Sequence, residues 1–223
     1  MEANEEHLFQ YLNEAAVEDG KVPSDMSTIF GSWSQQKGYP LLTVTRDYTT
    51  GAINLTQERF LLKPVENDDI KWWLPLNFMS KTKKDATDTA PMLWMKEEKE
   101  IVLKPNETTF GVINNDDWVI FNKQQTGYYR VQYDMDNWHL LMTALETDRA
   151  SINAINRAQI IDDSFNLARA GIEDYHVPFM LIKYLKQETD YLPWAAASNS
   201  FGYLNRMFIR STQYDQLQVS ILI

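Results

Sequence analysis

The chain holds three histidines, His7, His139 and His176, and no cysteine. A zinc-binding helix places two histidines four residues apart on one face, and no pair of these histidines has that spacing. The compact group of acids and histidine is Glu173, Asp174 and His176. Because acidic side chains at a helix start complement the helix dipole, this group is typical of a solvated helix terminus. The sequence also has no nucleophile elbow and no Gly-rich phosphate loop, so it shows no motif for nucleophilic catalysis or phosphate binding.

Asp162 and Asp163 form a second candidate, because paired carboxylates catalyse glycoside hydrolysis. On a helix these neighbours lie about 100° apart, so one faces packed residues and the other faces water. A glycosidase pair also needs a sugar cleft, whereas Arg157 and Arg169 on the same helix offer cationic partners. We therefore favour a polar network of Arg157, Asp162 and Arg169 that contacts an adjacent domain.

Aromatic residues could form a carbohydrate-binding surface, and two asparagine sequons could carry glycans. Trp72 and Trp73 are neighbours on an expected strand, so one ring belongs to the core and the other is exposed or docked on another domain. Asn54 and Asn106 each begin an Asn-x-Thr triplet, the acceptor sequence for N-linked glycans. Both are candidate glycosylation sites and fit a secreted surface. A sugar-binding sandwich is the least favoured alternative.

The charge balance argues against a nucleic-acid partner. The 31 acidic and 21 basic residues give a net charge of -10, and the tight basic cluster Lys81, Lys83 and Lys84 lies beside acidic residues. The lack of cysteine leaves the redox compartment undecided. No apolar run reaches the roughly 18 residues of a membrane span. Because residues 221–223 are apolar, which is rare at the end of a complete soluble domain, we expect a fragment of a longer protein.

Hydrophobic periodicity divides the chain into three regions. A period of 3.6 residues predicts helices over 4–17, capped by Asn4, and over 24–33, capped by Ser24. A period of two, broken by turn signals, then predicts an antiparallel β-sandwich in which residues 122–127 close the last hairpin. The expected strands cover residues 41–46, 52–60, 71–79, 91–96, 100–103, 108–113, 118–122 and 128–133.

The helical period returns from residue 136 onward. It predicts helices over residues 137–147, 152–170, 175–187 and 192–208, the second capped by Ser151 and closed by Gly171. Short connections between these helices indicate antiparallel pairs stacked as an αα array. The expected fold class is therefore α+β multidomain: a short helical N-terminal piece, an antiparallel β-sandwich, and a HEAT-like helical array.

Five sequence blocks, in order along nearly the whole chain, carry a resemblance to a known family. They are Trp33-Ser-Gln-Gln-Lys-Gly-Tyr39-Pro40, Gly51 through Thr56-Gln57-Glu58-Arg59-Phe60-Leu61, Trp118 through Asn122 with Gly127-Tyr128-Tyr129-Arg130-Val131-Gln132-Tyr133-Asp134, Arg157 through Ala168, and Tyr184-Leu through Glu188-Thr-Asp-Tyr191-Leu-Pro-Trp194. Together they resemble the M1 zinc aminopeptidases, most closely the membrane-anchored aminopeptidase N type of animals, particularly insects.

The resemblance implies three domains and a function. Residues 1–39 resemble the end of the thermolysin-like catalytic domain, 40–135 the β-sandwich domain, and 136–223 the start of the C-terminal helical domain. The family's zinc ligands and catalytic residues lie upstream of the matched segment, so no catalytic or metal role is transferred. The resemblance implies a structural or interdomain role for Trp33, Tyr39, Arg59, Tyr129, Arg130, Arg157, Asp162 and Asp163.

The expected function is therefore that of a non-catalytic fragment. The parent enzyme would remove N-terminal residues from peptides with a zinc cofactor, at the extracellular face of the plasma membrane. This chain would supply the spacer sandwich and part of the helical lid that gates the active site, and would be inactive alone. Its partners would be the remaining domains and, through them, peptide substrates. The alternative is a recognition module for a bacterial pore-forming toxin, with contacts at a sandwich edge, a glycan, or the charged loop at 81–89.

Overall fold

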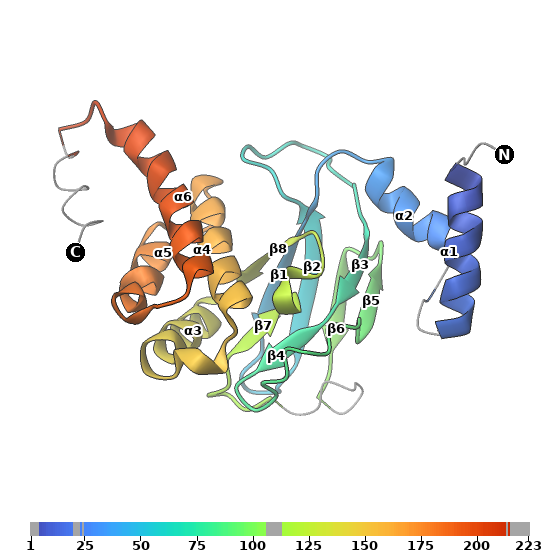
Figure 1. The fold of residues 1–223 in the computed structure, drawn as a ribbon, viewed down its shortest axis with the longest axis horizontal. Coiled ribbons are helices and arrows are strands. Elements are labelled where there is room, and N and C mark those ends of the chain that lie inside the picture. Colours follow the sequence, from blue (N-terminus) through green and yellow to red (C-terminus); the bar gives the residue numbers. More distant parts are fainter. Residues whose placement is uncertain (1–4, 20–22, 24, 106–112, 213, 215–223) are drawn as a thin grey trace.

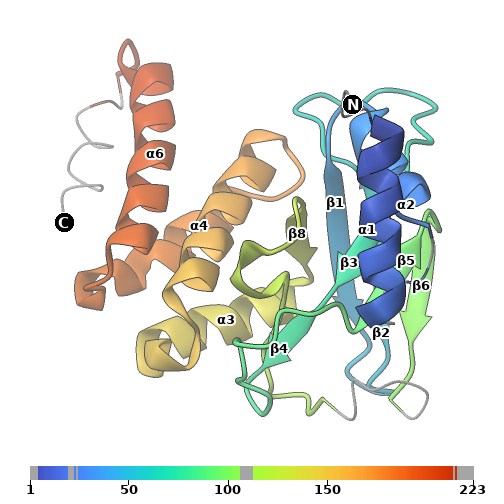
Figure 2. The same ribbon diagram turned by 45° about the vertical axis from the view of Figure 1, so that its right-hand side comes forward.

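The structure is a computed structural model that describes residues 5–19, 23, 25–105, 113–212 and 214. β-Strands form its centre, two N-terminal helices lie along one side, and the C-terminal helices pack along the other (Figures 1 and 2). The mixed α+β fold class expected from the periodicity is confirmed. The expected caps Asn4 and Ser24, the strand expected at 108–113 apart from Ile113, and the apolar end at 221–223 lie outside the described residues.

Helices α1 (Glu5–Asp19) and α2 (Met26–Ser34) pack against each other through the rings of Phe9 and Phe30, whose centroids are 5.9 Å apart. The backbone N–H of Met26 donates to Asn13 Oδ1 at 2.7 Å, so a side chain from α1 satisfies a free donor at the start of α2. The indole Nε1 of Trp33 donates to Trp73 O at 3.0 Å. Helix α2 is thereby tied to the strands.

The largest sheet has the strand order β6-β2-β1-β8. Strands β1 (Pro40–Arg46) and β2 (Ile53–Arg59) form the expected hairpin, and β6 (Glu100–Leu103) pairs antiparallel with β2. Strand β8 (Arg130–Tyr133) pairs with β1 in parallel, which departs from the all-antiparallel expectation. Along the chain, strands that pair elsewhere lie between β1 and β8. This long connection lets β8 return beside β1 in the same direction.

Two antiparallel pairs complete the strands: β3 (Trp73–Leu76) with β5 (Leu93–Lys96), and β4 (Phe78–Ser80) with β7 (Val119–Phe121). The expected strand over 71–79 is divided at Asn77, whose Oδ1 accepts from Lys123 N at 2.7 Å. The hairpin expected at 122–127 is wrong. That segment contains the short 3₁₀ helix η1 (Lys123–Gln125) and leads from β7, paired with β4, to β8, paired with β1. Its polar composition resembles a tight turn, but the strand partners are distant in sequence.

The C-terminal part is helical, as expected. Its elements are α3 (Met135–Thr147), η2 (Arg149–Ser151), α4 (Ala154–Arg169), α5 (His176–Leu181), η3 (Ile182–Gln187) and α6 (Tyr191–Phe208). The helix expected over 175–187 thus divides into α5 and the 3₁₀ helix η3. Helix α4 packs mainly on α6 (Figure 1).

The residue expected to cap the start of α4 is wrong, whereas the glycine expected to end the helix is confirmed. Asn153 Oδ1 accepts from Asn156 N at 3.0 Å and caps α4, whereas the expected cap Ser151 belongs to η2. Gly171 closes the helix with φ of 73°, and its N–H donates to Ala168 O at 3.0 Å. A left-handed glycine after the last turn is the common helix stop, which is why the sequence could predict this end.

The hydrophobic core is continuous across the strands and the helices. Leu41 and Val131 of the large sheet belong to the same buried cluster as Trp138 of α3, Ile161 of α4 and Leu204 of α6. Because one cluster of buried residues includes members of both parts, the sheet and the helices are packed on each other.

Candidate functional site at the junction of sheet and helices

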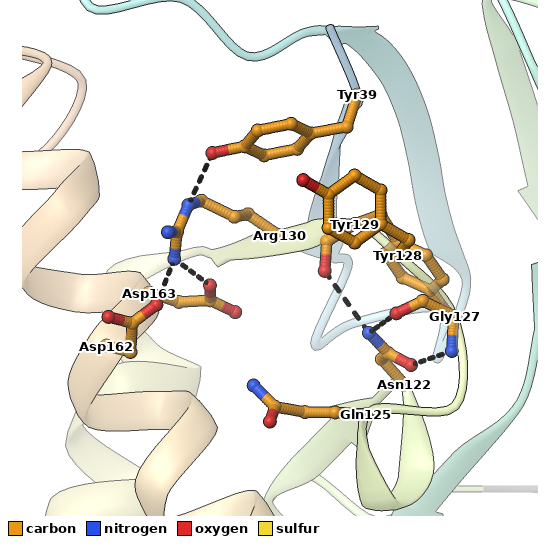
Figure 3. Close-up of a pocket in the computed structure, with 9 residues that line it drawn as sticks. All are labelled: Tyr39, Asn122, Gln125, Gly127, Tyr128, Tyr129, Arg130, Asp162 and Asp163. Carbon is orange, nitrogen blue, oxygen red and sulfur yellow. Dashed lines mark hydrogen bonds and ion pairs between the residues drawn. The ribbon is translucent and has the colours of Figure 1, made fainter. Parts of the chain in front are cut away.

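One arginine joins the large sheet to the helices. Arg130, the first residue of β8, donates from Nη1 to Asp162 Oδ2 at 2.5 Å and to Asp163 Oδ1 at 2.8 Å, both on α4. Its Nε donates to the hydroxyl of Tyr39 at 3.1 Å. Figure 3 shows Arg130 reaching toward the two carboxylates with the Tyr39 ring beside it. A single guanidinium therefore links β8, α4 and the segment that enters β1.

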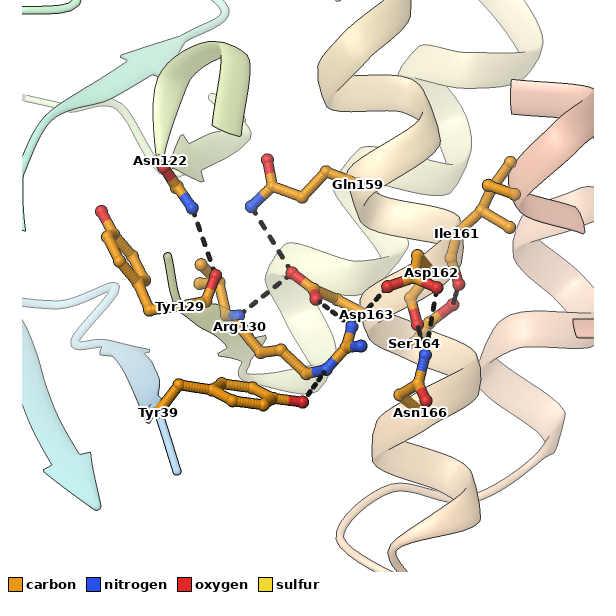
Figure 4. Close-up of polar contacts among 12 residues, drawn as sticks. Tyr39, Asn122, Tyr129, Arg130, Gln159, Ile161, Asp162, Asp163, Ser164 and Asn166 are labelled. Atoms are coloured by element: carbon orange, nitrogen blue, oxygen red, sulfur yellow. Dashed lines mark hydrogen bonds and ion pairs between the residues drawn. The ribbon is translucent and has the colours of Figure 1, made fainter. Parts of the chain in front are cut away.

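Asp163 is the buried carboxylate of this junction, with 3 % of the residue exposed. Its Oδ2 accepts from the backbone N–H of Val131 at 3.1 Å, and Gln159 Nε2 lies 3.4 Å from the same oxygen (Figure 4). Burial raises the pKa of Asp163 to about 7, against the opposing effect of Arg130, and the charge of Asp162 adds to the rise. Asp162 has 39 % of its side chain exposed, which confirms that one carboxylate faces neighbours and the other water.

A pocket of about 300 Å³ opens beside this junction. It is lined by Tyr39, Asn122, Gln125, Gly127, Tyr128, Tyr129, Arg130, Asp162 and Asp163 (Figure 3). Asn122 and Gln125 have positive φ angles of 65° and 52°, and the side chain of Asn122 is held by Gly127 O at 2.9 Å. Since Arg130 already binds both carboxylates, the pocket offers polar and aromatic contacts rather than an acid–base pair.

A second arginine connects α4 to the start of α6. Arg157 donates from Nε to Glu188 Oε2 at 2.7 Å and from Nη2 to Glu188 Oε1 at 3.1 Å, and Nη2 also binds Asp190. The side chains of Arg157 and Glu188 are 6 % and 0 % exposed. This two-point contact is a buried ion pair, which a lysine could not reproduce.

The predicted network of Arg157, Asp162 and Arg169 is wrong. Arg157 binds Glu188, Asp162 binds Arg130, and the guanidinium of Arg169 lies 4.2 Å from the ring centroid of Tyr203. Residues five positions apart on a helix point about 140° away from each other, so Arg157 and Asp162 lie on different faces of α4. Each of the three residues contacts a residue from outside α4 and none contacts another member of the predicted network.

The other residues expected to have structural roles also make contacts between elements. Arg59 Nε donates to Asp68 Oδ2 at 2.7 Å, and the Tyr129 hydroxyl donates to Pro75 O at 3.1 Å. Trp72 is fully buried and Trp73 is half-buried, as expected for neighbours on a strand. Whether any of these residues has an interdomain role stays a prediction.

Sequence reasoning missed Glu188 as a partner of Arg157 and missed the amides around Asn156. Asn156 Oδ1 accepts from Gln124 N at 2.9 Å, and its Nδ2 donates to Asn122 O at 3.0 Å. These contacts join η1 to α4 and hold the backbone where Asn122 has its positive φ. No sequence motif marks them, because Asn156 is one polar residue in the first turn of a helix and its partners are about thirty residues away along the chain.

Of the two candidate glycosylation sites, the structure describes Asn54 and not Asn106. Asn54 is half-buried in β2, between β1 and β6, and its Oδ1 atom is buried without a hydrogen-bond partner. Asn106 lies outside the described residues. Glycosylation of either residue stays a prediction.

The acid and histidine cluster makes one contact with strand β8 and one contact within the cluster itself. Glu173 Oε2 accepts from Gln132 Nε2 at 2.7 Å, and Asp174 Oδ1 accepts from the backbone N–H of His176 at 2.7 Å. Within the part of the chain that the structure describes, no three acids or histidines are grouped so that they could hold a metal ion. Over the same residues, no helix combines the length and apolar character needed to cross a membrane.

The chain is thus a segment in which a sheet is bonded to a layer of helices through Arg130, and comparison with known proteins shows which proteins contain such a segment. Residues 118–222 match the family described as ERAP1-like C-terminal domain. The chain is 40 % identical over 219 residues to Aminopeptidase N of Plutella xylostella, and 36 % identical over 231 residues to Aminopeptidase N of Rattus norvegicus. It is 33 % identical over 224 residues to Membrane alanyl aminopeptidase of Heliothis virescens.

These matches cover 96 %, 95 % and 96 % of this chain but 22 %, 22 % and 21 % of the relatives. The chain therefore spans about a fifth of the length of the curated relatives it matches. The resemblance is confirmed: this chain corresponds to part of the C-terminal region of an M1 aminopeptidase of the aminopeptidase N type.

Proposed function

We propose that this chain is a non-catalytic segment of a zinc aminopeptidase, in which it spaces the catalytic domain from a helical lid and carries part of that lid. The observation that carries the proposal is the junction at Arg130, where the sheet and the helical layer are bonded by a buried ion pair. A rigid junction transmits a movement of the helices to the sheet, as gating requires. The similarity to aminopeptidase N over nearly the whole chain supplies the enzyme class.

We extend the proposal to the domains. Residues 1–39 would end the catalytic domain, 40–135 would form the β-sandwich domain, and 136–223 would begin the helical domain. Two observations support these bounds: strand β1 begins at Pro40, and helix α3 begins at Met135. The bond from Trp33 to Trp73 supports a fixed contact between the first piece and the sandwich.

The parent protein would hold its zinc outside this chain, act on the N-terminal residues of peptides, and lie on the extracellular face of the plasma membrane. The relatives' names support this location, since they include a membrane alanyl aminopeptidase and a thyrotropin-releasing hormone-degrading ectoenzyme. Within this proposal, the residues of this chain contribute positioning and no chemical step.

Two assays test the proposal. The chain alone is incubated with a panel of aminoacyl chromogenic substrates, and its metal content is measured; we expect no turnover and no stoichiometric zinc. Zinc-dependent, chelator-sensitive turnover by the chain alone would overturn the proposal. In the full-length parent enzyme, Arg130→Met is expected to lower kcat/KM for peptides while zinc content stays at wild-type level. Unchanged kcat/KM would contradict a gating role for the junction.

The alternative of toxin recognition is tested in parallel with the same chain. Residues 81–85 are exposed, and Lys84 Nζ lies 3.1 Å from Asp148 Oδ2, so the loop is accessible yet held near α3. Capture of a purified pore-forming toxin that is lost on substitution of 81–89 would favour the alternative over the architectural proposal.

A further inference from the structure

The pocket of about 300 Å³ beside Arg130, called the junction pocket below, has no part in the proposed architectural function. It lies between α4 on one side and β8 with the segment before it on the other (Figure 3). Its volume is at the lower end of the range of small-molecule pockets, roughly 300 to 1,000 Å³, which is room for a compact ligand.

The charged groups of the junction pocket compensate one another. Arg130 Nη1 donates to Asp162 at 2.5 Å and to Asp163 at 2.8 Å. Burial raises the pKa of Asp163 to about 7, so near neutral pH this carboxyl group is only partly ionised and the three groups together carry little net charge. An anion finds no free cation here and a cation finds no uncompensated carboxylate, so the pocket suits a neutral ligand.

Several hydrogen-bonding groups of the lining are left over for such a ligand. Within the residues that the structure describes, the side-chain amide of Gln125 and the hydroxyl of Tyr128 have no hydrogen-bond partner. Figure 3 shows the amide of Gln125 pointing into the space in front of Asp163. The Tyr39 hydroxyl accepts from Arg130 Nε at 3.1 Å, so its own proton stays available. Amides and phenols both donate and accept, and this matches ligand hydroxyls, which do the same.

An aromatic wall lies beside these groups. Tyr128 is 72 % exposed, and its ring centroid lies 5.2 Å from that of Tyr39. Tyr39 in turn stacks on Phe60 at 5.5 Å, which holds it at the side of the pocket. The face of an aromatic ring carries partial negative charge, so the exposed ring of Tyr128 can contact the C–H groups on one face of a sugar ring.

The segment that carries Gln125 has an unusual backbone conformation. Asn122, Gln124 and Gln125 have φ angles of 65°, 52° and 52°, a region that residues other than glycine seldom adopt. Contacts from outside hold it: Gln124 N donates to Asn156 Oδ1 at 2.9 Å, and Asn122 Nδ2 donates to Gly127 O at 2.9 Å. Backbone of this kind concentrates at functional sites and ligand clamps, where it positions side chains before the ligand arrives.

A peptide is the other neutral ligand that such groups could bind, and at a sheet edge it binds by adding a strand. Beside the junction pocket, however, the backbone N–H of Val131 already donates to Asp163 Oδ2 at 3.1 Å. A side chain thus occupies the donor that an added strand would need. The pocket therefore favours a compact ring with several hydroxyls over an extended chain.

We infer that the junction pocket binds one neutral sugar ring, stacked on Tyr128 and hydrogen-bonded by Gln125 and Tyr39. Neighbouring hydroxyls of a pyranose match the donor and acceptor of one amide side chain. Two sources share this chemistry: a free monosaccharide, and the terminal residue of a glycan. The inference concerns binding alone, so it does not depend on the parent's peptidase activity.

Saturation-transfer NMR on the full 223-residue chain tests the inference. The probes are the methyl glycosides of glucose, mannose, galactose and N-acetylglucosamine, with N-acetyl-dialanine amide as a peptide of similar size. We expect transfer to at least one glycoside, strongest at the C–H protons of one ring face. Transfer to no glycoside, or equally strong transfer to the peptide, would overturn the inference. Tighter binding of a trisaccharide that ends in the same sugar identifies the glycan source, and weaker binding identifies the free sugar.

Variants decide whether the junction pocket is responsible. Tyr128→Ala and Gln125→Asn are each expected to weaken binding of the best glycoside about tenfold, measured by titration of the transfer signal. Asparagine tolerates the positive φ at this position but has a shorter reach, so the backbone is kept while the contact is lost.

Tyr191→Ala is the matched control, because it removes a tyrosine that is 80 % exposed at the start of α6, outside the pocket. Its affinity for the glycoside should equal that of the wild type. Circular dichroism checks that all variants keep the wild-type fold. Binding that survives the combination of Tyr128→Ala and Gln125→Asn, or that Tyr191→Ala weakens as much as Tyr128→Ala, would place the sugar elsewhere and overturn the inference.

Discussion

Arg130 Nη1 lies 2.8 Å from Asp163 Oδ1, so the first residue of β8 is bonded to the middle of α4. Asp163 also accepts the backbone N–H of Val131, the next residue of β8. Because β8 is the last strand of its sheet, that N–H has no neighbouring strand on its outer side. One carboxylate therefore binds a charged side chain and also provides the acceptor that the sheet edge lacks.

Arg130→Met is expected to destabilise the chain by about 3 kcal/mol at pH 8, because it leaves the buried carboxyl group of Asp163 without its cation. The measurement is urea unfolding followed by circular dichroism. Lys81→Met serves as the control, since the Lys81–Asp116 pair is largely exposed and its loss should leave the midpoint unchanged. Equal midpoints for Arg130→Met and the wild type would show that the junction contributes no stability.

Asp163 is expected to make stability fall as pH rises from about 5 to about 8. Burial raises its folded pKa to about 7, above the value of about 4 in an unfolded chain, so the folded state binds more protons in between. The stabilisation is complete below the unfolded pKa and is lost as pH rises through the folded pKa. Asp163→Asn should flatten the dependence of the unfolding free energy over this range. A profile unchanged by that substitution would contradict the assignment.

Arg157→Lys is expected to destabilise by about 2 kcal/mol, although the charge is kept. Lysine cannot bind both oxygens of Glu188 and also donate to Ile152 O, so the two-point contact and the bond to this buried carbonyl cannot all be kept. Thermal unfolding of the chain measures the loss. Arg149→Lys, at a partly exposed position that makes no ion pair with a carboxylate among the described residues, is the matched control and should leave Tm unchanged. If both variants melt alike, the two-point contact contributes little.

Helices and strands were predicted correctly where the residues that determine their bounds lie close to them along the chain. The hairpin of β1 and β2 follows from two alternating runs around Gly51, and the end of α4 follows from Gly171. The split of Asp162 and Asp163 into a partly exposed and a buried side chain follows from helical geometry alone.

Partners that are distant in sequence could not be predicted in the same way. The parallel pairing of β8 with β1 depends on a crossover through residues 122–127, and their polar composition equally suits a hairpin turn. Likewise, the helical stripe of α4 shows which residues are polar, but it does not show that Arg157 turns toward Glu188 and Asp162 toward Arg130. Tertiary packing decides those pairings.

Gly127→Ala is expected to destabilise the junction by about 2 kcal/mol, because the added methyl group would overlap a buried ring. A Cβ at Gly127 would lie 2.2 Å from Tyr129 Cε1, and Tyr129 is 6 % exposed, with its hydroxyl bonded to Pro75 O. The ring has no room to withdraw without breaking that bond. Gly171→Ala is the matched control: nothing lies within 4 Å of its Cβ, so it carries only the cost of a positive φ, about 1 kcal/mol. The free energies come from urea unfolding of both variants, and a Gly127→Ala loss no larger than that of Gly171→Ala would show that the Tyr129 ring moves freely.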